Sequence, residues 1–159
     1  MRSVDERNKM IEKIRTLPQV LARTVCDLDD EQLDTPYGDG KWTVRQVVHH
    51  LADAHLNAFA RMKLILTEDN PVLKTYDQDR WTETIDARQI NVQSSLLILT
   101  GLHLRWCELM ESLSEKDWSR SASHPEIGEV TMIRLLEIYS GHGENHLSQI
   151  KKLREVKNW

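Results

Sequence analysis

Apolar side chains recur every three or four positions through most of the chain, which is the spacing of one face of an α-helix. Four long stretches carry this period, at about residues 4–26, 43–66, 88–113 and 131–156. Pro18 lies inside the first stretch and predicts a kink or a restart there, and Thr43 can cap the second. Helices with one apolar stripe each can bury those stripes only against one another. The sequence therefore predicts an all-α fold, a four-helix bundle, that forms a single domain over residues 1–159.

The stretch between the second and third helices, residues 67–87, is polar, contains Pro71 and has no sustained period. It predicts a long loop, and loops of this length in a compact domain are often functional. Trp81 in this loop is therefore a candidate to line the mouth of a pocket. A second break ahead of the fourth helix contains the letters EIGEVT, which predict a short extended segment or turn, and His124 before a proline is typical of a turn.

Composition and charge narrow the classes of function. The net charge is −4, the isoelectric point is near 6.0, and no block of like charge could follow a phosphate backbone, so nucleic acid is not an expected partner. Cys26 and Cys107 are the only cysteines, which excludes a disulfide framework and a zinc-finger spacing. No stretch approaches the ~18 apolar residues that a membrane span needs. We expect a cytoplasmic protein with no membrane partner.

The letters GHGENH near the end of the chain place His142 and His146 four residues apart. At 100° per residue both lie within about 60° of Tyr139, the middle of the apolar stripe, so both point inward. Two imidazoles at this spacing can bind one metal ion, or they can be two core histidines that only form hydrogen bonds. Glu144 falls on the solvent side of the same helix, which argues against the HExxH protease motif.

A third metal ligand would have to come from another helix. His55 and His103 lie on inward faces, and His50 lies on the flank of the second helix. Helical periodicity leaves these three open. His49 and Asp53 are expected to face water, on the side of the second helix away from its stripe.

Two segments carry a resemblance to a known family. The stretch LDDEQLDTPYGDGKWTVRQVVHHLADAHLNAFARMKLILTEDNP, followed by YSGHGENHLSQI, resembles the DinB-like metal-dependent enzymes, and among them the YfiT type, also described as bacillithiol S-transferases. The likeness covers about residues 15–157. It implies a four-helix bundle of unusual connectivity, usually a homodimer, that binds a divalent metal ion through three histidines.

The resemblance also selects the three ligands. The family's first ligand is the histidine of a W-(7 residues)-H-L pattern, which Trp42 and His50 match in this chain. Its other two form the HxxxH pair ahead of a Gln-aliphatic pair, which His142 and His146 match. The resemblance thus implies a metal site of His50, His142 and His146. Four further residues are candidates to line the pocket or support the ligands: His55, His103, Tyr139 and Trp81.

Three neutral imidazoles would leave coordination positions of the ion free, as in catalytic sites. The leading hypothesis, which rests on the resemblance, is an enzyme that activates a low-molecular-weight thiol such as bacillithiol for attack on a small electrophile. A second is a hydrolase that generates hydroxide from water on the ion. A third is a metal-binding or small-molecule-binding protein without turnover, because the sequence offers no clear general acid or base. Imidazole suits several metals, of which we expect zinc or nickel.

Overall fold

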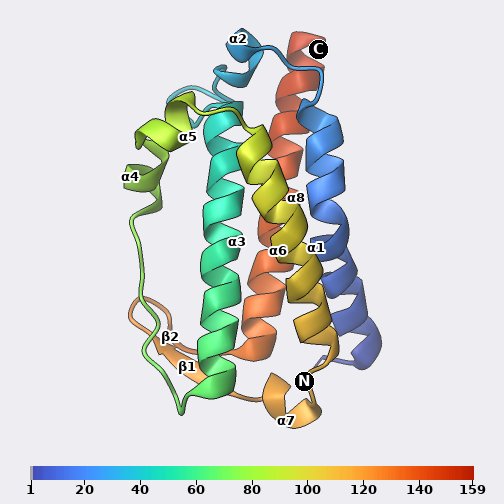
Figure 1. Cartoon of the computed structure of the whole chain (residues 1–159), viewed down its shortest axis with the longest axis vertical. Coiled ribbons are helices and arrows are strands. Elements are labelled where there is room, and N and C mark those ends of the chain that lie inside the picture. Colours follow the sequence, from blue (N-terminus) through green and yellow to red (C-terminus); the bar gives the residue numbers. More distant parts are fainter. Residues whose placement is uncertain (1) are drawn as a thin grey trace.

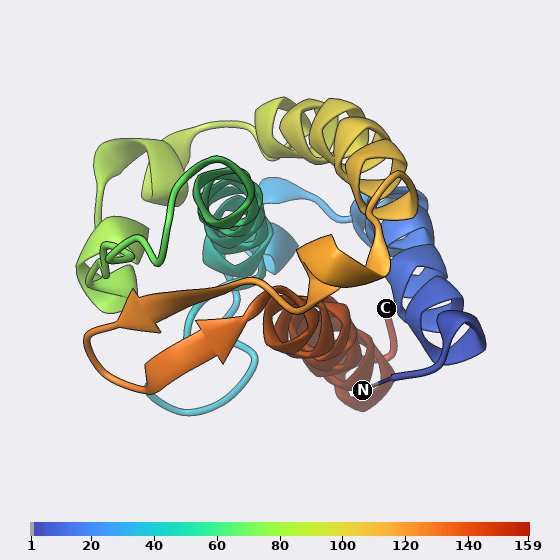
Figure 2. The same cartoon turned by 90° about the horizontal axis from the view of Figure 1, so that it is seen from below.

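The computed structural model describes residues 2–159. Four long helices lie side by side and form the body of the molecule (Figure 1): α1 Val4–Val25, α3 Val44–Thr67, α6 Gln93–Glu111 and α8 Met132–Lys157. Viewed along the bundle, α3, α6, α1 and α8 follow one another around its axis, so α1 lies diagonally across from α3 (Figure 2). The predicted all-α four-helix bundle is confirmed.

Side-chain caps define the starts of the helices that carry the histidines. The Thr43 side chain accepts a hydrogen bond from the Gln46 N–H, and the Gln46 side chain accepts one from the Thr43 N–H, which starts α3 as a capping box. The Thr131 side chain caps α8 by accepting a hydrogen bond from the Arg134 N–H, without a reciprocal bond. Pro18 lies within a continuous α1, so the helix does not restart there.

The connection between α3 and α6 is more ordered than the expected loop. It contains two short helices, α4 Gln78–Thr82 and α5 Ile85–Gln89, both of which pack against α3. The third helix begins at Gln93, not near position 88, because the chain is extended at Ile90 between α5 and α6. The apolar period continues from α5 into α6, so the pattern alone does not show that the helix is interrupted at Ile90.

Smaller elements close the ends of the bundle. The chain has two further short helices, α2 Asp30–Leu33 and α7 Glu115–Trp118. Strands β1 Ser121–His124 and β2 Gly128–Thr131 form an antiparallel hairpin, where an extended segment was expected. The hairpin holds the start of the α3–α6 connection, because the Leu73 N–H donates to the Ser123 carbonyl at 2.9 Å. None of the helices within residues 2–159 has the length and hydropathy that a bilayer crossing requires.

The interior of the bundle consists of two apolar cores with histidines between them. The hairpin-side core lies next to the β-hairpin, and its members include Ile14, Met62, Ile65, Trp106, Met110 and Leu136. The far-side core lies toward the C-terminal end of α8, and its members include Leu17, Leu21, Val47, Leu51, Leu99 and Ile150. The buried or half-buried histidines between them form the histidine layer: His50, His55, His103, His142 and His146.

Candidate metal centre

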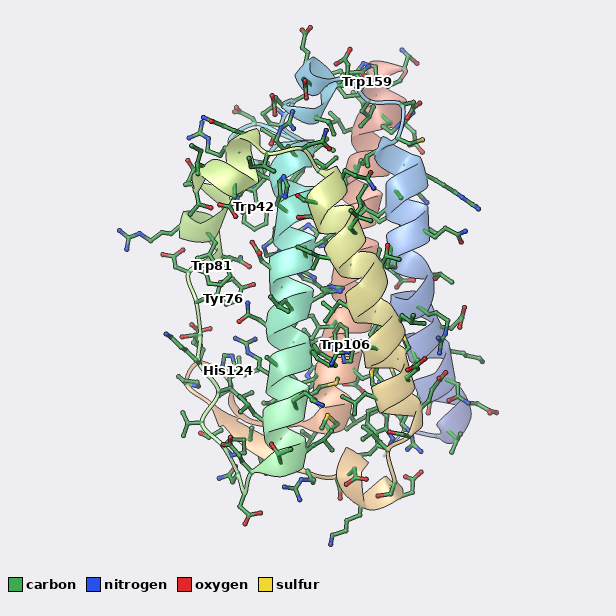
Figure 3. The ribbon with its side chains drawn as sticks, viewed as in Figure 1. Trp42, Tyr76, Trp81, Trp106, His124 and Trp159 are labelled. Atoms are coloured by element: carbon green, nitrogen blue, oxygen red, sulfur yellow. The ribbon has the colours of Figure 1, made fainter. Side chains whose placement is uncertain are left out.

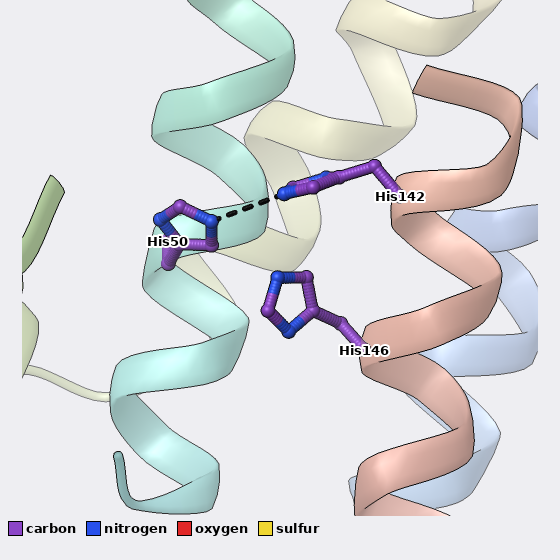
Figure 4. A group of neighbouring side chains, drawn as sticks. All are labelled: His50, His142 and His146. Atoms are coloured by element: carbon purple, nitrogen blue, oxygen red, sulfur yellow. Dashed lines mark hydrogen bonds between the residues drawn. The ribbon is translucent and has the colours of Figure 1, made fainter. Parts of the chain in front are cut away.

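Three histidines from two helices converge between the two cores (Figure 4). His50 comes from α3, and His142 and His146 come from successive turns of α8. One ring nitrogen from each lies within 4.8 Å of the others, and the Nε2 atoms of His50 and His142 are 3.2 Å apart. Two imidazole nitrogens bound to one tetrahedral zinc ion would lie about 3.4 Å apart. The three rings therefore have the spacing of ligands to a single ion.

Neighbouring side chains orient two of these rings. The ring of Trp42 packs against His50 and His146, with centroid distances of 4.6 and 6.0 Å. The Gln149 side-chain oxygen accepts a hydrogen bond from His146 Nδ1 at 2.8 Å, which leaves Nε2 of that ring as the free lone pair. Trp42, which the W-(7 residues)-H pattern places eight positions before His50, thus packs its indole against both His50 and His146.

A chain of hydrogen bonds behind His142 determines which of its nitrogens is free. His103 Nδ1 lies 2.6 Å from the carbonyl oxygen of Ile14, which can only accept, so Nδ1 carries the proton. His103 Nε2 must then accept from His55 Nδ1 at 2.8 Å, and His55 Nε2 must accept from His142 Nδ1 at 3.3 Å. Nε2 of His142 is consequently left with its lone pair, on the side that faces His50.

Burial keeps these imidazoles neutral. Burial first, and the neighbouring imidazoles second, lower the pKa of His50 to about 3 and the pKa of His142 to about 4. Burial also lowers the pKa of His146, and burial with the neighbouring imidazoles lowers that of His55 well below its ordinary value. Neutral imidazole is the form that binds metal ions, so the site is ready to bind one at neutral pH without first losing protons.

A pocket opens beside the three histidines. It has a volume of about 410 Å³ and lies between α3, α8, the start of the α3–α6 connection and the β-hairpin. Its lining includes His50, Ala54, Arg61, Tyr76, Asp77, His124, Glu126, Tyr139 and His142. A larger hollow of about 560 Å³ near the start of α3 contains no histidine and lies apart from this cluster. Of these two pockets, the smaller one is therefore the candidate substrate pocket, because it adjoins the histidine cluster.

The other candidate residues take different places. Tyr139 lines the pocket, and its ring contacts that of His142. His55 and His103 do not line it, because they are buried behind His142 with 0% and 1% of their surfaces exposed. Trp81 is also outside the lining: it is 41% exposed and packs on Tyr76, which does face the pocket (Figure 3).

Two expectations about the second helix were wrong. His49 is buried, because α6 and the segment before it cover that side of α3, and its nitrogens contact Ser95 Oγ at 2.7 Å and the Ile90 carbonyl at 3.0 Å. Asp53 is half-buried, and burial with a smaller contribution from Asp86 raises its pKa to about 6. Glu144 is exposed as expected and forms an ion pair with Lys13 at 2.9 Å.

Several residues of the pocket wall were not among the sequence candidates, His124 and Arg61 among them. His124 ends strand β1 and lines the pocket, where a plain turn residue was expected (Figure 3). Arg61 also lines it, and at 100° per residue it lies only about 20° from His50 on α3. That shared face is the signal that could have identified Arg61, whereas nothing local to His124 indicates which element it meets.

This helical bundle gathers three neutral imidazoles, two of which line a pocket, and such a donor set can hold a divalent ion that keeps a free coordination position. The chain belongs to the DinB superfamily, whose family model matches residues 13–150. The resemblance seen in the sequence is thereby confirmed.

Two relatives with 45–47% sequence identity are both named as metal-dependent hydrolases. A protein of Oceanobacillus iheyensis named "Putative metal-dependent hydrolase" is 47% identical over 152 residues, which cover 96% of this chain and 88% of that protein. One of Bacillus mycoides with the same name is 45% identical, over 96% of this chain and 87% of its own length. These names and the three-histidine cluster together indicate a metal ion, without identifying it.

Solved structures agree on the fold. YfiT from Bacillus subtilis, described as "a probable metal-dependent hydrolase with an unusual four-helix bundle topology", superposes with a TM-score of 0.97 at 38% identity, over 100% of this chain and 91% of that one. A mycothiol-dependent maleylpyruvate isomerase superposes with a TM-score of 0.71 at 16% identity, over 94% of this chain and 63% of that one. At that identity the second likeness concerns the fold alone.

Proposed function

We propose that this protein is an enzyme that binds one divalent metal ion, zinc or nickel, through His50, His142 and His146 and conjugates a low-molecular-weight thiol to a small electrophile. The observation that carries the proposal is the cluster of three ring nitrogens within 4.8 Å, two of whose histidines also line the pocket. The preference for a thiol over water rests on the resemblance to bacillithiol S-transferases.

The residues of the chain would divide the work. A bound divalent ion supplies a Lewis acid that lowers the pKa of a thiol or water in its free position. The hydrogen bonds from Ile14 through His103 and His55 hold His142 in the tautomer that leaves Nε2 free. Gln149 does the same for His146. These contacts fix the donor atoms before any ion arrives, which reduces the cost of ordering them.

The pocket wall offers neutral donors to a substrate. Burial raises the pKa of Tyr76 to about 12, and it also raises the pKa of Tyr139, so both phenols remain protonated at neutral pH. Tyr139 accepts a hydrogen bond from Arg61 at 3.0 Å, and its own hydroxyl proton is free to be donated. A small electrophile bound here would be oriented by hydroxyl groups that do not compete as nucleophiles.

The test is conjugation of bacillithiol to monochlorobimane by protein loaded in turn with zinc and nickel. We expect the loaded protein to accelerate conjugate formation, His142→Ala to remove the acceleration, and Glu144→Gln to retain it, because Glu144 is exposed and faces away from the site. Acceleration that survives in His142→Ala, or none with either metal, would contradict the proposal.

The names of the relatives at 45–47% identity favour a second candidate, hydrolysis of a small ester or amide. Release of 4-nitrophenol from 4-nitrophenyl acetate without any thiol distinguishes the two. A rate that depends on one ionisation near neutrality and disappears with a chelator would support hydrolysis. Tight metal binding with neither reaction would indicate a binding protein instead. Light scattering tests the homodimer that the resemblance implies.

A further inference from the structure

Arg61 is held at the wall of the pocket with one nitrogen unused. Its Nη1 donates to the Tyr139 hydroxyl at 3.0 Å, and its Nη2 donates to the Lys74 carbonyl at 2.8 Å. Its Nε is the one buried side-chain nitrogen or oxygen within residues 2–159 that has no hydrogen-bond partner. Buried polar groups in native proteins are nearly always paired, so the chain leaves the guanidinium of Arg61 incompletely satisfied.

The half-buried guanidinium of Arg61 also forms no ion pair, unlike the buried arginines elsewhere in the bundle, although Asp77 and Glu126 line the same pocket. Arg45 pairs with Asp30 at 2.8 Å and with Asp34 at 2.6 Å, and Arg7 pairs with Glu115. No ion pair among the residues that the structure describes includes Arg61, whose two partners are a phenol and a carbonyl. A guanidinium that is partly removed from water gains from an anionic partner, and neither carboxylate of the pocket forms an ion pair with it.

The position of Arg61 relates it to the three histidines. His50, Ala54 and Arg61 lie within about 40° of one another around α3, so they form one stripe along the pocket. Ala54 has the small side chain of the three, which leaves room between the two ends of that stripe. Across the pocket, Tyr139 contacts Arg61 through its hydroxyl and the His142 ring at a centroid distance of 5.8 Å. A small molecule in this pocket can therefore reach the histidines at one end and the guanidinium at the other.

We infer that Arg61 is the anion-binding residue of this pocket, and that the small molecule bound there carries a carboxylate which pairs with the guanidinium. The planar guanidinium suits a carboxylate, with which it forms charge-assisted hydrogen bonds. This inference rests on the proposed function for the identity of the site and adds the class of ligand that the site takes.

The first test uses thiols that differ only in charge. Protein loaded with Co²⁺ is titrated with 3-mercaptopropionate and 6-mercaptohexanoate, each against its neutral primary amide, and thiol binding is followed by the sulfur-to-cobalt absorption. We expect at least one acid to bind about ten- to a hundredfold more tightly than its amide. Arg61→Gln removes that preference while metal content is unchanged, and Arg61→Lys retains part of it. Arg105→Gln, at an exposed arginine over Phe59, leaves it intact.

The second test needs no thiol, so the two proposals can fail separately. Calorimetry compares succinate with succinamide on the metal-loaded wild type and on Arg61→Gln, with melting curves to verify that the variant is folded. If no thiol changes the cobalt spectrum but succinate still requires Arg61, thiol transfer fails and the anion site stands. If every acid binds no better than its amide in the wild type, or if Arg61→Gln keeps the preference, the inference is overturned.

Discussion

The four helices of the bundle enclose two different kinds of interior: the two apolar cores, and the histidine layer between them. The hairpin-side and far-side cores are apolar and closely packed, with members such as Leu21 and Leu136 fully buried. In the histidine layer His55 and His103 are just as buried but form hydrogen bonds to each other, to His142 and to the Ile14 carbonyl. The cores can hold the bundle together without the layer, because the hydrophobic effect is proportional to apolar area. Stability and metal binding should therefore respond to different substitutions.

The largest effect is expected on stability, from a change in an apolar core. Leu21→Ala removes a fully buried side chain of α1, a helix that contributes none of the three histidines. It should lower the free energy of unfolding by roughly 2–5 kcal/mol and leave metal affinity unchanged. Denaturant unfolding in chelator and a metal titration check the two parts. Leu104→Ala, at a position that is 57% exposed, is the control and should cost little.

A comparably large effect, on metal affinity instead of stability, is expected from a substitution in the histidine layer. His146→Ala should weaken metal binding by more than the roughly hundredfold that loss of an outer hydrogen-bond partner causes, because it deletes a donor atom. Competition with a chromophoric chelator measures the change. The metal-free variant should still unfold cooperatively. Loss of the fold on chelating the metal from the wild type would show instead that the ion is structural, and the separation of cores and layer would be wrong.

A smaller effect is expected from the hydrogen bonds behind the ligands. His103→Phe keeps the ring volume but leaves His55 without its acceptor, so His142 loses the arrangement that frees Nε2. Metal affinity should fall by about 10- to 100-fold. His49→Phe is the matched control, since it also breaks two hydrogen bonds of a buried histidine but on another side of α3. Equal metal affinity of both variants would mean that the chain from Ile14 does not position His142.

The effect that is smallest for one histidine and one pH unit is the change of stability with pH. In the metal-free protein burial lowers the pKa of His50 to about 3 and those of His103 and His142 to about 4, below the ordinary 6.5. These groups then bind more protons in the unfolded state, so stability is complete above about pH 6.5 and is lost as the pH falls toward 4. The slope is up to about 1.4 kcal/mol per pH unit for each such histidine.

One carboxyl group acts against this trend. Burial raises the pKa of Asp53 to about 6, so its contribution to stability grows as the pH falls. The histidines outnumber it, and the net slope should have their sign. Unfolding free energies in chelator at pH 7 and pH 5 measure it, and His103→Phe should have a shallower slope than the wild type. A stability that does not change between these pH values would mean that the layer is solvated.

Most of the bundle could be predicted from local patterns. The cap at Thr43 and the apolar stripes of α3 and α8 are local signals, and both helices begin within one residue of the starts that these signals predict. The short helices α4 and α5 could not be predicted, because five residues are too few to show a period. They form because they pack on α3, and their contacts bury Thr82 and Ala87.

The sequence by itself determined that His142 and His146 point inward and that Glu144 does not, because these directions depend only on one helix and its own apolar stripe. The partner from α3 was decided by the tertiary structure. His55 lies nearer the centre of its stripe than His50, yet it bonds to His103 and to Nδ1 of His142, while His50 on the flank faces the free Nε2 of His142. A helical angle gives the direction of a side chain relative to the axis of its own helix. Which histidine of α3 lies against His142 depends on how α8 packs on the flank of α3.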